Sequence, residues 1–234
     1  MTKPDLSGEQ MKLLVTLLAM CACSLAVAHG VAVGDQGYIQ EISGVKPFPF
    51  IFLGAAHMVT GYDHLLFLLA VIFFLYNNRD VTKYVTLFAL GHSITLIVGV
   101  LFDVAANAYV IDAIIGLSIV YKALDNLGAY QRWFGVQPNT KLATWIFGLF
   151  HGLGLATKIQ DLEVSPDGLL ANLIYFNIGV EIGQLIALAW ILVLVGFWRL
   201  YPSYYRHAIA TNVAIMAAGF MLIGYQLTGY FIFS

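Results

Sequence analysis

Six apolar stretches dominate the chain, and each is close to the length that crosses a lipid bilayer as a helix. The hydrocarbon core takes about 20 helical residues. Between polar breaks, the stretches cover residues 50–76, 84–102, 109–124, 142–159, 169–198 and 208–233. Only 10% of the residues are charged, whereas a soluble domain has about 25%. Because backbone polar groups in lipid must be paired within the protein, we predict an all-α membrane protein, a six-transmembrane-helix bundle in the lipid bilayer.

A shorter apolar stretch over residues 13–27 differs from the other six. It follows Lys12 and ends in Ala26-Val27-Ala28, which are the charged start, short apolar middle and small-residue end of a secretory signal peptide. We expect cleavage after Ala28; the alternative is an uncleaved seventh helix. The predicted organisation is a signal peptide, 1–28, with an upstream extension, 1–10, before a start at Met11, then a short exported lead-in, 29–49, and the transmembrane domain, 50–234.

Cleavage after Ala28 would also limit the metal chemistry of the mature chain. Cys21 and Cys23 are the two cysteines and both lie in the signal segment, so disulfides and thiolate sites would be excluded. A metal would then be held by nitrogen and oxygen, which suits Ni²⁺, Co²⁺, Zn²⁺, Cu²⁺ or Mn²⁺ better than Cu⁺. His29 would become the mature N-terminus and would either capture a divalent ion at the exported face or simply be solvated.

The basic residues of the loops predict the orientation in the membrane. If the mature N-terminus is exported, the outer loops hold one basic residue, Lys158, and the lead-in adds Lys46. The inner loops and helix ends hold Arg79, Lys83, Lys122, Arg132, Lys141, Arg199 and Arg206. This excess agrees with the positive-inside rule and places both mature termini on the exported side of a bacterial-type inner membrane. No basic run indicates a nucleic-acid partner.

Two histidines and an aspartate lie within eight residues of the first predicted span: His57, Asp63 and His64. A central Asp costs about 2.5 to 3.5 kcal/mol on insertion, so such groups usually mark a site or a pathway. On a regular helix, His57 and His64 would share a face but stand about 10.5 Å apart. Either Gly61 breaks the helix and brings them together, or they form two stations for an ion. Asp63 is either a ligand or an acceptor that fixes a histidine tautomer.

Each of the next four spans carries one histidine or acidic residue: His92, Asp112, His151 and Glu181. If the helices close around one axis, most of these groups converge with those of the first span. The predicted metal ligands are His57, Asp63, His64, His92, His151 and Glu181, a set of imidazoles and carboxylates that first-row metals favour. A lone intramembrane histidine such as His92 is equally typical of a helix-to-helix hydrogen bond.

Other polar and small residues of the spans have supporting roles in this interpretation. Asn177 and Gln184 share a helix face with Glu181, so we expect them to contact the ligand side chains rather than the ion itself. Asp112 lies near the outer end of its span, where it would either hold helices together or, like Asn177 and Gln184, contact the ligand side chains. The GxxxG pairs Gly148/Gly152 and Gly179/Gly183 predict close helix contacts.

Several of these motifs resemble the HupE/UreJ family of membrane proteins, which is associated with hydrogenase and urease and regarded as nickel permeases. The His-x5-Asp-His signature of that family is matched by His57, Asp63 and His64, with Gly61 also in place. Further similarity lies in Gly91-His92-Ser93, in Phe150-His151-Gly152-Leu153-Gly154 and in residues 176–184.

The better studied branch has a Phe-His-Gly-x-Ala/Val-His-Gly-x-Glu motif, of which this chain lacks the second His and the Glu. It therefore resembles a second HupE/UreJ-like branch. The resemblance implies nickel, with another divalent metal as the alternative, and metalloenzyme-maturation partners.

We therefore predict a permease that passes a divalent transition metal, nickel first and Zn, Co, Cu or Mn as alternatives, through an intramembrane site. The histidines would be ligands, and Asp63 and Glu181 would ligate or balance charge. No nucleotide-binding motif is present, so transport would be passive, ion-coupled or powered by a partner. Two alternatives stay open: a membrane-embedded zinc-dependent hydrolase with an open position for water, and a metal-binding accessory protein that does not transport. The oligomeric state, including a homo-oligomer, is also open.

Overall fold

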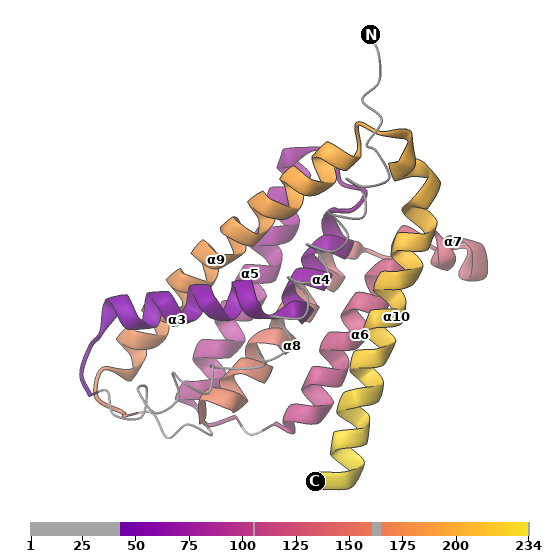
Figure 1. Ribbon diagram of the computed structural model, residues 1–234. Helices are drawn as coiled ribbons and strands as arrows, with labels where there is room; N and C mark the ends of the chain where they lie inside the picture. The colour runs from indigo at the N-terminus through magenta and orange to yellow at the C-terminus, as the bar shows by residue number, and fades with distance from the viewer. Residues whose placement is uncertain (1–42, 105, 161–164, 234) are drawn as a thin grey trace, which may run out of the picture.

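The computed structural model describes residues 43–104, 106–160 and 165–233, and its regular elements in these residues are all α-helices (Figure 1). They are α3 (Pro47–Thr60), α4 (Tyr62–Ile72), α5 (Asn78–Leu101), α6 (Ala108–Asn126), α7 (Ala129–Phe134), α8 (Thr140–Gln160), α9 (Leu169–Trp198) and α10 (Pro202–Phe233). The all-α class is thereby confirmed for this part of the chain. The predicted signal peptide, both cysteines and His29 lie outside the described residues.

Four of these helices are long and apolar enough to cross a membrane, namely α5, α8, α9 and α10. The pair formed by α3 and α4 makes a fifth if it is counted as one bent span. The predicted span 109–124 forms α6, which has 19 residues. It also carries three charged residues, Asp112, Lys122 and Asp125, so its composition is less apolar than that of the others. The sixth span therefore stays a prediction.

The first predicted span is broken at Gly61, where α3 and α4 meet at an angle of 63°. Gly61 has φ −69° and ψ 102°, outside the helical region. Its N–H donates to the carbonyl of His57 (3.0 Å), and its own carbonyl accepts from Leu65 N–H (3.1 Å). A negative φ is open to any residue, so the need for glycine here is one of space. A Cβ atom at this position would lie 2.5 Å from Nδ1 of His64.

Three helix pairs pack most closely, α5 with α8, α3 with α9, and α6 with α10, and α4 lies in the middle of the bundle (Figure 1). The predicted glycine contacts are confirmed. A Cβ atom at Gly152 of α8 would overlap the carbonyl oxygen of His92 in α5, and one at Gly179 of α9 would overlap that of Ile51 in α3. These pairs are thus held at backbone-to-backbone distance, which only small residues allow.

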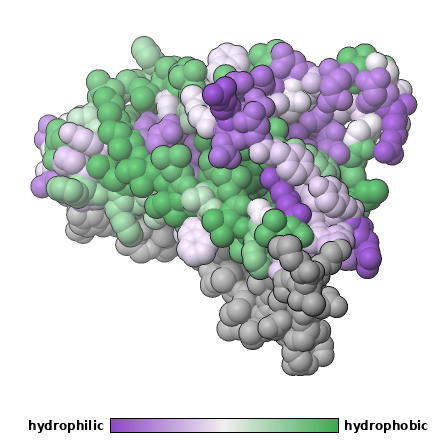
Figure 2. Space-filling view, turned by 90° about the horizontal axis from the view of Figure 1, so that it is seen from above, coloured by the Kyte–Doolittle hydropathy of each residue, from purple (hydrophilic) through white to green (hydrophobic). Residues whose placement is uncertain are grey.

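The outside of the bundle is largely apolar, as expected for helices in contact with lipid. Large exposed side chains follow the outer faces of α5 and α9, including Leu90, Ile94, Leu185, Trp190 and Val193. Figure 2 shows hydrophilic residues gathered on the side of α7 and hydrophobic side chains over much of the remaining face.

Charged groups inside the bundle are paired, either across helices or within one helix. Lys158 of α8 donates to both carboxylate oxygens of Asp112 in α6 (3.0 and 2.9 Å), and Gln226 of α10 donates to the same carboxylate (3.3 Å). Asp112 is buried and Lys158 mostly so. Toward the other end of α6, Lys122 pairs with Asp125 at 2.7 Å. The charged residues of α6 are therefore paired with other helices or with one another.

The end of α4 that lies away from Gly61 is fixed to the junction of α9 and α10. Arg199 donates to the carbonyl oxygens of Ile72 (2.7 Å) and Phe73 (2.6 Å), and the hydroxyl of Tyr204 donates to the second of these (2.5 Å). The guanidinium also lies 4.4 Å from the ring centre of Tyr76. A cation at a helix C-terminus interacts favourably with the carbonyl dipoles, so this clamp anchors α4.

Replacing Gly179 by Val is expected to lower the free energy of unfolding by about 1–3 kcal/mol, because the added side chain forces α3 and α9 apart. Thermal unfolding of the detergent-solubilised protein, followed by circular dichroism, measures the effect. Gly196→Val is the matched control in the same helix, since a Cβ atom there meets nothing within 4 Å. Equal midpoints for the two variants would contradict the close contact.

Replacing Lys158 by Met is expected to destabilise the protein by about 3–5 kcal/mol, because the buried carboxylate of Asp112 loses its counter-charge. The double variant Asp112→Asn/Lys158→Met should recover much of this loss in the same unfolding assay. Lys83→Met breaks the exposed pair with Asp80 and should cost less than about 1 kcal/mol. If Lys158→Met is as mild as Lys83→Met, the buried pair does not stabilise the bundle.

Candidate metal centre

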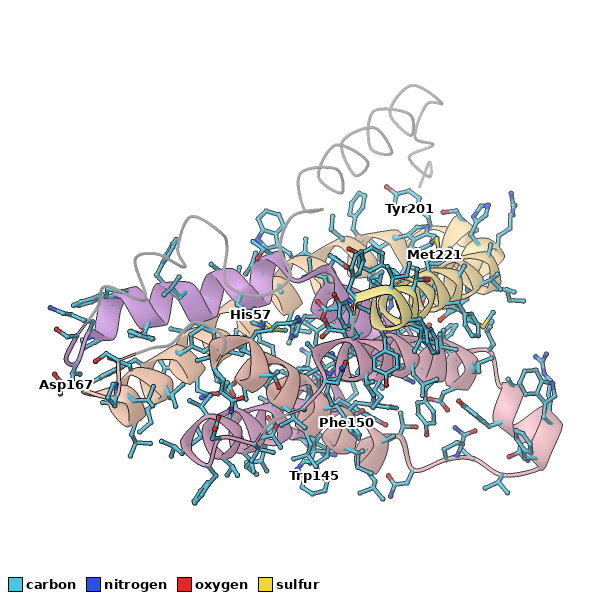
Figure 3. The ribbon with its side chains drawn as sticks, turned by 90° about the horizontal axis from the view of Figure 1, so that it is seen from below. His57, Trp145, Phe150, Asp167, Tyr201 and Met221 are labelled. Carbon is cyan, nitrogen blue, oxygen red and sulfur yellow. The ribbon has the colours of Figure 1, made fainter. Side chains whose placement is uncertain are left out.

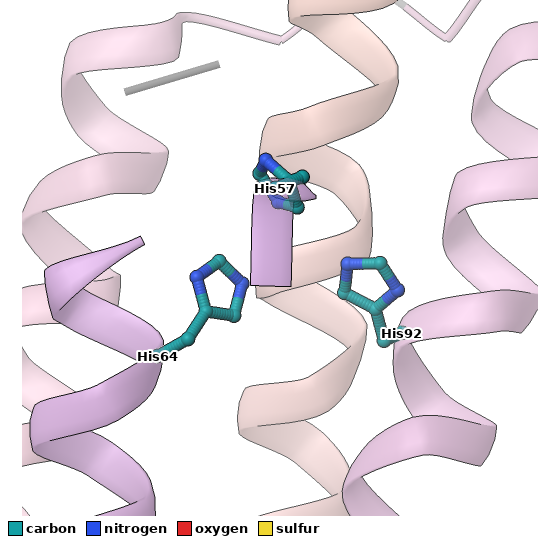
Figure 4. A group of neighbouring side chains, drawn as sticks. All are labelled: His57, His64 and His92. Carbon is teal, nitrogen blue, oxygen red and sulfur yellow. The ribbon is translucent and has the colours of Figure 1, made fainter. Parts of the chain in front are cut away.

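Four imidazoles and a carboxylate from four helices gather in the middle of the bundle. Figure 4 shows His64 of α4 and His92 of α5 on either side of His57 of α3. The ring centre of His64 lies 4.9 Å from that of His57, 6.3 Å from that of His92 and 5.1 Å from that of His151 in α8. Nδ1 of His64 is 3.0 Å from Oδ1 of Asp63. The structure thus brings together five of the six predicted ligands, with His64 at the centre.

The break at Gly61 makes this gathering geometrically feasible. On a straight helix the two histidines of the first span would be about 10.5 Å apart along the axis, but their ring centres are 4.9 Å apart. Figure 3 shows His57 on the inner side of α3, whereas Trp145 lies at the edge of the molecule. Of the two alternatives for the first span, the structure therefore has the broken helix.

Three of the histidines are almost completely removed from solvent and retain nitrogens with no partner in the described residues. The exposed fractions are 4% for His64, 0% for His92 and 2% for His151. Nε2 of His64, Nε2 of His151 and both ring nitrogens of His92 have no hydrogen-bond partner there. Because about 90% or more of buried polar groups are normally hydrogen-bonded, such a concentration indicates that these nitrogens bind something else.

Two of these rings have the tautomer that metal binding requires. The backbone carbonyl of Phe147 can only accept, so Nδ1 of His151 donates to it (2.8 Å) and Nε2 carries the lone pair. An ionised carboxylate also only accepts, so Nδ1 of His64 donates its hydrogen to Asp63. Nε2 is then again the nitrogen with the lone pair that a metal can bind. Histidines that bind metals usually donate their other ring N–H in this way. The arrangement therefore fits a metal centre in its protonation as well as its position.

The cluster contains two groups of three residues whose ligand atoms all lie within 4.8 Å of one another. One group is His57, His64 and His92, and the other is Asp63, His64 and His151. Donor atoms about 2 Å from a common ion lie at most about 4 Å apart, so small side-chain movements would bring either group onto one ion. Imidazole with a carboxylate suits Ni, Zn, Co and Cu, and these residues could hold any of them.

Phenylalanines enclose the cluster, and the sequence interpretation did not anticipate them. The ring of Phe88 lies 4.8 Å from that of His151 and 6.2 Å from that of His92, and Phe67 lies 5.6 Å from His151. Phe176 of α9 lies 6.1 Å from His57. These apolar walls lower the local dielectric and strengthen any ion–ligand interaction. Phenylalanine is common in every apolar span, so no signal distinguished these three.

The polar stripe predicted on α9 is divided by the structure. Asn177 and Gln184 are buried, with amide groups that donate to the carbonyls of Leu173 (3.0 Å) and Val85 (3.4 Å). Glu181 lies on the exposed side of the same helix and belongs to neither group of three. The boundary between the buried and the exposed face of α9 therefore runs between Glu181 and the pair Asn177 and Gln184. Ligation by Glu181 thus stays a prediction that its placement does not favour.

The remaining predicted site residues lie elsewhere. The hydrogen bonds described for Asp112 go to Lys158 and Gln226, and it joins helices rather than the histidine cluster. This agrees with the helix-packing alternative. Capture of an ion by His29 stays a prediction, since that residue lies outside the described part of the chain.

The chain matches a known protein family over most of its length. The family model described as HupE / UreJ protein matches residues 33–234, which is most of the chain and includes all the residues of the cluster. No curated protein and no solved structure is significantly similar to the chain.

Replacing Gly61 by Ala is expected to lower the affinity for Co²⁺ about 10–100-fold, because the new methyl group displaces His64 from the cluster. Equilibrium dialysis of the purified protein measures this affinity. Gly224→Ala in α10 is the matched control, since a Cβ atom there meets nothing within 4 Å. Wild-type affinity in Gly61→Ala would show that the cluster is not the binding site.

Proposed function

The chain belongs to the HupE / UreJ family, and from this premise we propose that it is a permease for a divalent transition metal, with nickel as the first candidate. Membership of this family indicates a role related to metal transport at a membrane. The ion would pass through the cluster of His57, Asp63, His64, His92 and His151, with the imidazoles as its main ligands. Nickel fits because imidazole nitrogen is among its preferred donors.

The single observation that supports this proposal most strongly is the set of buried histidine nitrogens without partners in the described residues. Nε2 of His64, Nε2 of His151 and both nitrogens of His92 lie among apolar side chains. Burying such groups costs free energy unless something binds them. Helix packing alone would favour apolar residues at these positions, so the cost argues for a function of the cluster itself.

The charge of the cluster favours passage over permanent retention. Asp63 is the one carboxylate in the two groups of three, so a divalent ion held by neutral imidazoles and one carboxylate would keep a net positive charge in a dry environment. A transported ion must be bound well enough to enter and weakly enough to leave. Full neutralisation by two carboxylates would instead favour a resident ion.

A broken helix at the binding residues also supports transport. Discontinuous helices at binding sites inside the membrane recur in secondary transporters, where backbone and side-chain groups near the break contact the ion. Here the break at Gly61 lies between His57 and His64 in the sequence. The first turn of α4 carries both Asp63 and His64, and anionic groups are favoured at a helix N-terminus.

A zinc-dependent hydrolase is the second candidate, because each group of three offers the ligand count of a catalytic zinc with one open position. Such an enzyme also needs a general base near the metal-bound water. Asp63 is engaged with His64, and Glu181 lies on the exposed face of α9. The absence of a placed base in either group of three makes transport the better-supported function.

We expect the purified protein in liposomes to admit Ni²⁺ to a metal-sensitive dye trapped inside, and His64→Ala to reduce the initial rate to that of protein-free liposomes. His64 is common to both groups, so its removal leaves each with two ligands. His207→Ala is the matched control, because His207 is exposed and bonded only to the carbonyl of Ser203 among the described residues.

The same preparation separates the alternatives. Bound metal without flux would favour the accessory protein, and hydrolysis of peptide substrates that depends on Zn²⁺ would favour the enzyme. Undiminished flux through correctly folded His64→Ala would rule out passage by way of the cluster.

A further inference from the structure

The two groups of three share one residue, and from this we propose that they are alternating stations for a single ion, between which His64 passes it. We call His57, His64 and His92 station A, and Asp63, His64 and His151 station B. This inference rests on the proposed transport function and states how the ion moves through the site.

The stations differ in the helices that build them. Station A takes its other ligands from α3 and α5, whereas station B takes them from α4 and α8. His64 lies between, with ring centres 4.9 Å from His57 and 5.1 Å from His151. One imidazole is therefore within reach of both sets of partners, and no other residue is common to them.

Asp63 has a different role at each station. When the ion is at station A, Asp63 accepts the Nδ1–H of His64, as in the structure (3.0 Å), and leaves Nε2 as the donor atom. When the ion is at station B, a carboxylate oxygen of Asp63 binds the ion and this hydrogen bond weakens. The contact that orients His64 for station A is thus weakened as station B fills, which couples the two states.

The stations exclude each other. A shared ligand cannot complete both sets at once, and two divalent ions a few ångströms apart repel strongly among apolar walls. His64 retains a bond to the ion while the other two ligands are exchanged. The ion therefore moves between stations without losing all its ligands, which lowers the barrier compared with full release into the protein interior.

The test uses Co²⁺, whose visible absorption reports the number and type of its donor atoms, with the full chain purified in detergent. His151→Ala retains station A, with three nitrogens, and His92→Ala retains station B, with two nitrogens and an oxygen. We expect each of these variants, like the wild type, to bind about one Co²⁺ per chain with spectra that differ from each other. We expect His64→Ala to bind none.

The same two variants should fail in transport. In liposomes, His92→Ala and His151→Ala are each expected to lose at least about ten-fold in the rate of Co²⁺ flux, the lower end of what altered ligand surroundings cost, although each still binds the ion. His207→Ala controls for loss of an imidazole. His92→Gln and His151→Gln replace any alanine variant that elutes as aggregate.

The outcomes distinguish the models. Loss of Co²⁺ binding in both single variants, or identical spectra for the two, would mean one common site and overturn the proposal. Two ions bound per wild-type chain, or wild-type flux in either variant, would overturn it as well. If the wild type carries no flux, the proposed transport function itself fails. If the wild type carries flux but one of the contrary binding, spectral or variant results is found, only the proposal of two stations is overturned.

Discussion

The bend at Gly61 is the constraint on which the candidate site depends. A straight first span would separate its two histidines by two helical turns, and no ion could bind both. The 63° bend brings their rings to 4.9 Å and directs His64 toward α5 and α8. The glycine is needed because any side chain would collide with the ring that the bend positions. The bend of the first span and the position of the His64 ligand thus both depend on Gly61.

The close helix pairs set the other distances of the site. Gly152 lies next to His151 in sequence and touches the backbone of His92 in space, so the contact that joins α5 to α8 also aligns two of the rings. On the other side, Gly54 and Gly179 press α3 against α9. Small residues next to large polar ones let helices approach until their imidazoles meet, and Phe67, Phe88 and Phe176 close the remaining space.

Much of the site could be predicted because charged and imidazole groups are conspicuous in apolar spans. One such group per helix was enough to predict that His92 and His151 meet the cluster of the first span. Periodicity gives the angle of a residue on its helix but not where the buried surface ends, so Glu181 was grouped with Asn177 and Gln184 although it lies outside. The Lys158–Asp112 pair joins residues 46 apart in sequence, and no local pattern could indicate it.

The anchoring of α4 has a mechanical consequence. Arg199 and Tyr204 hold its far end, while α3 is tied along its length to α9 through glycine contacts. Both arms of the bend at Gly61 are therefore attached to α9, so α3, α4 and α9 form the three sides of a closed triangle. The bend angle could change only if α3 moved along α9 or the contacts of Arg199 broke, so contacts far from both rings fix the position of His57 relative to His64.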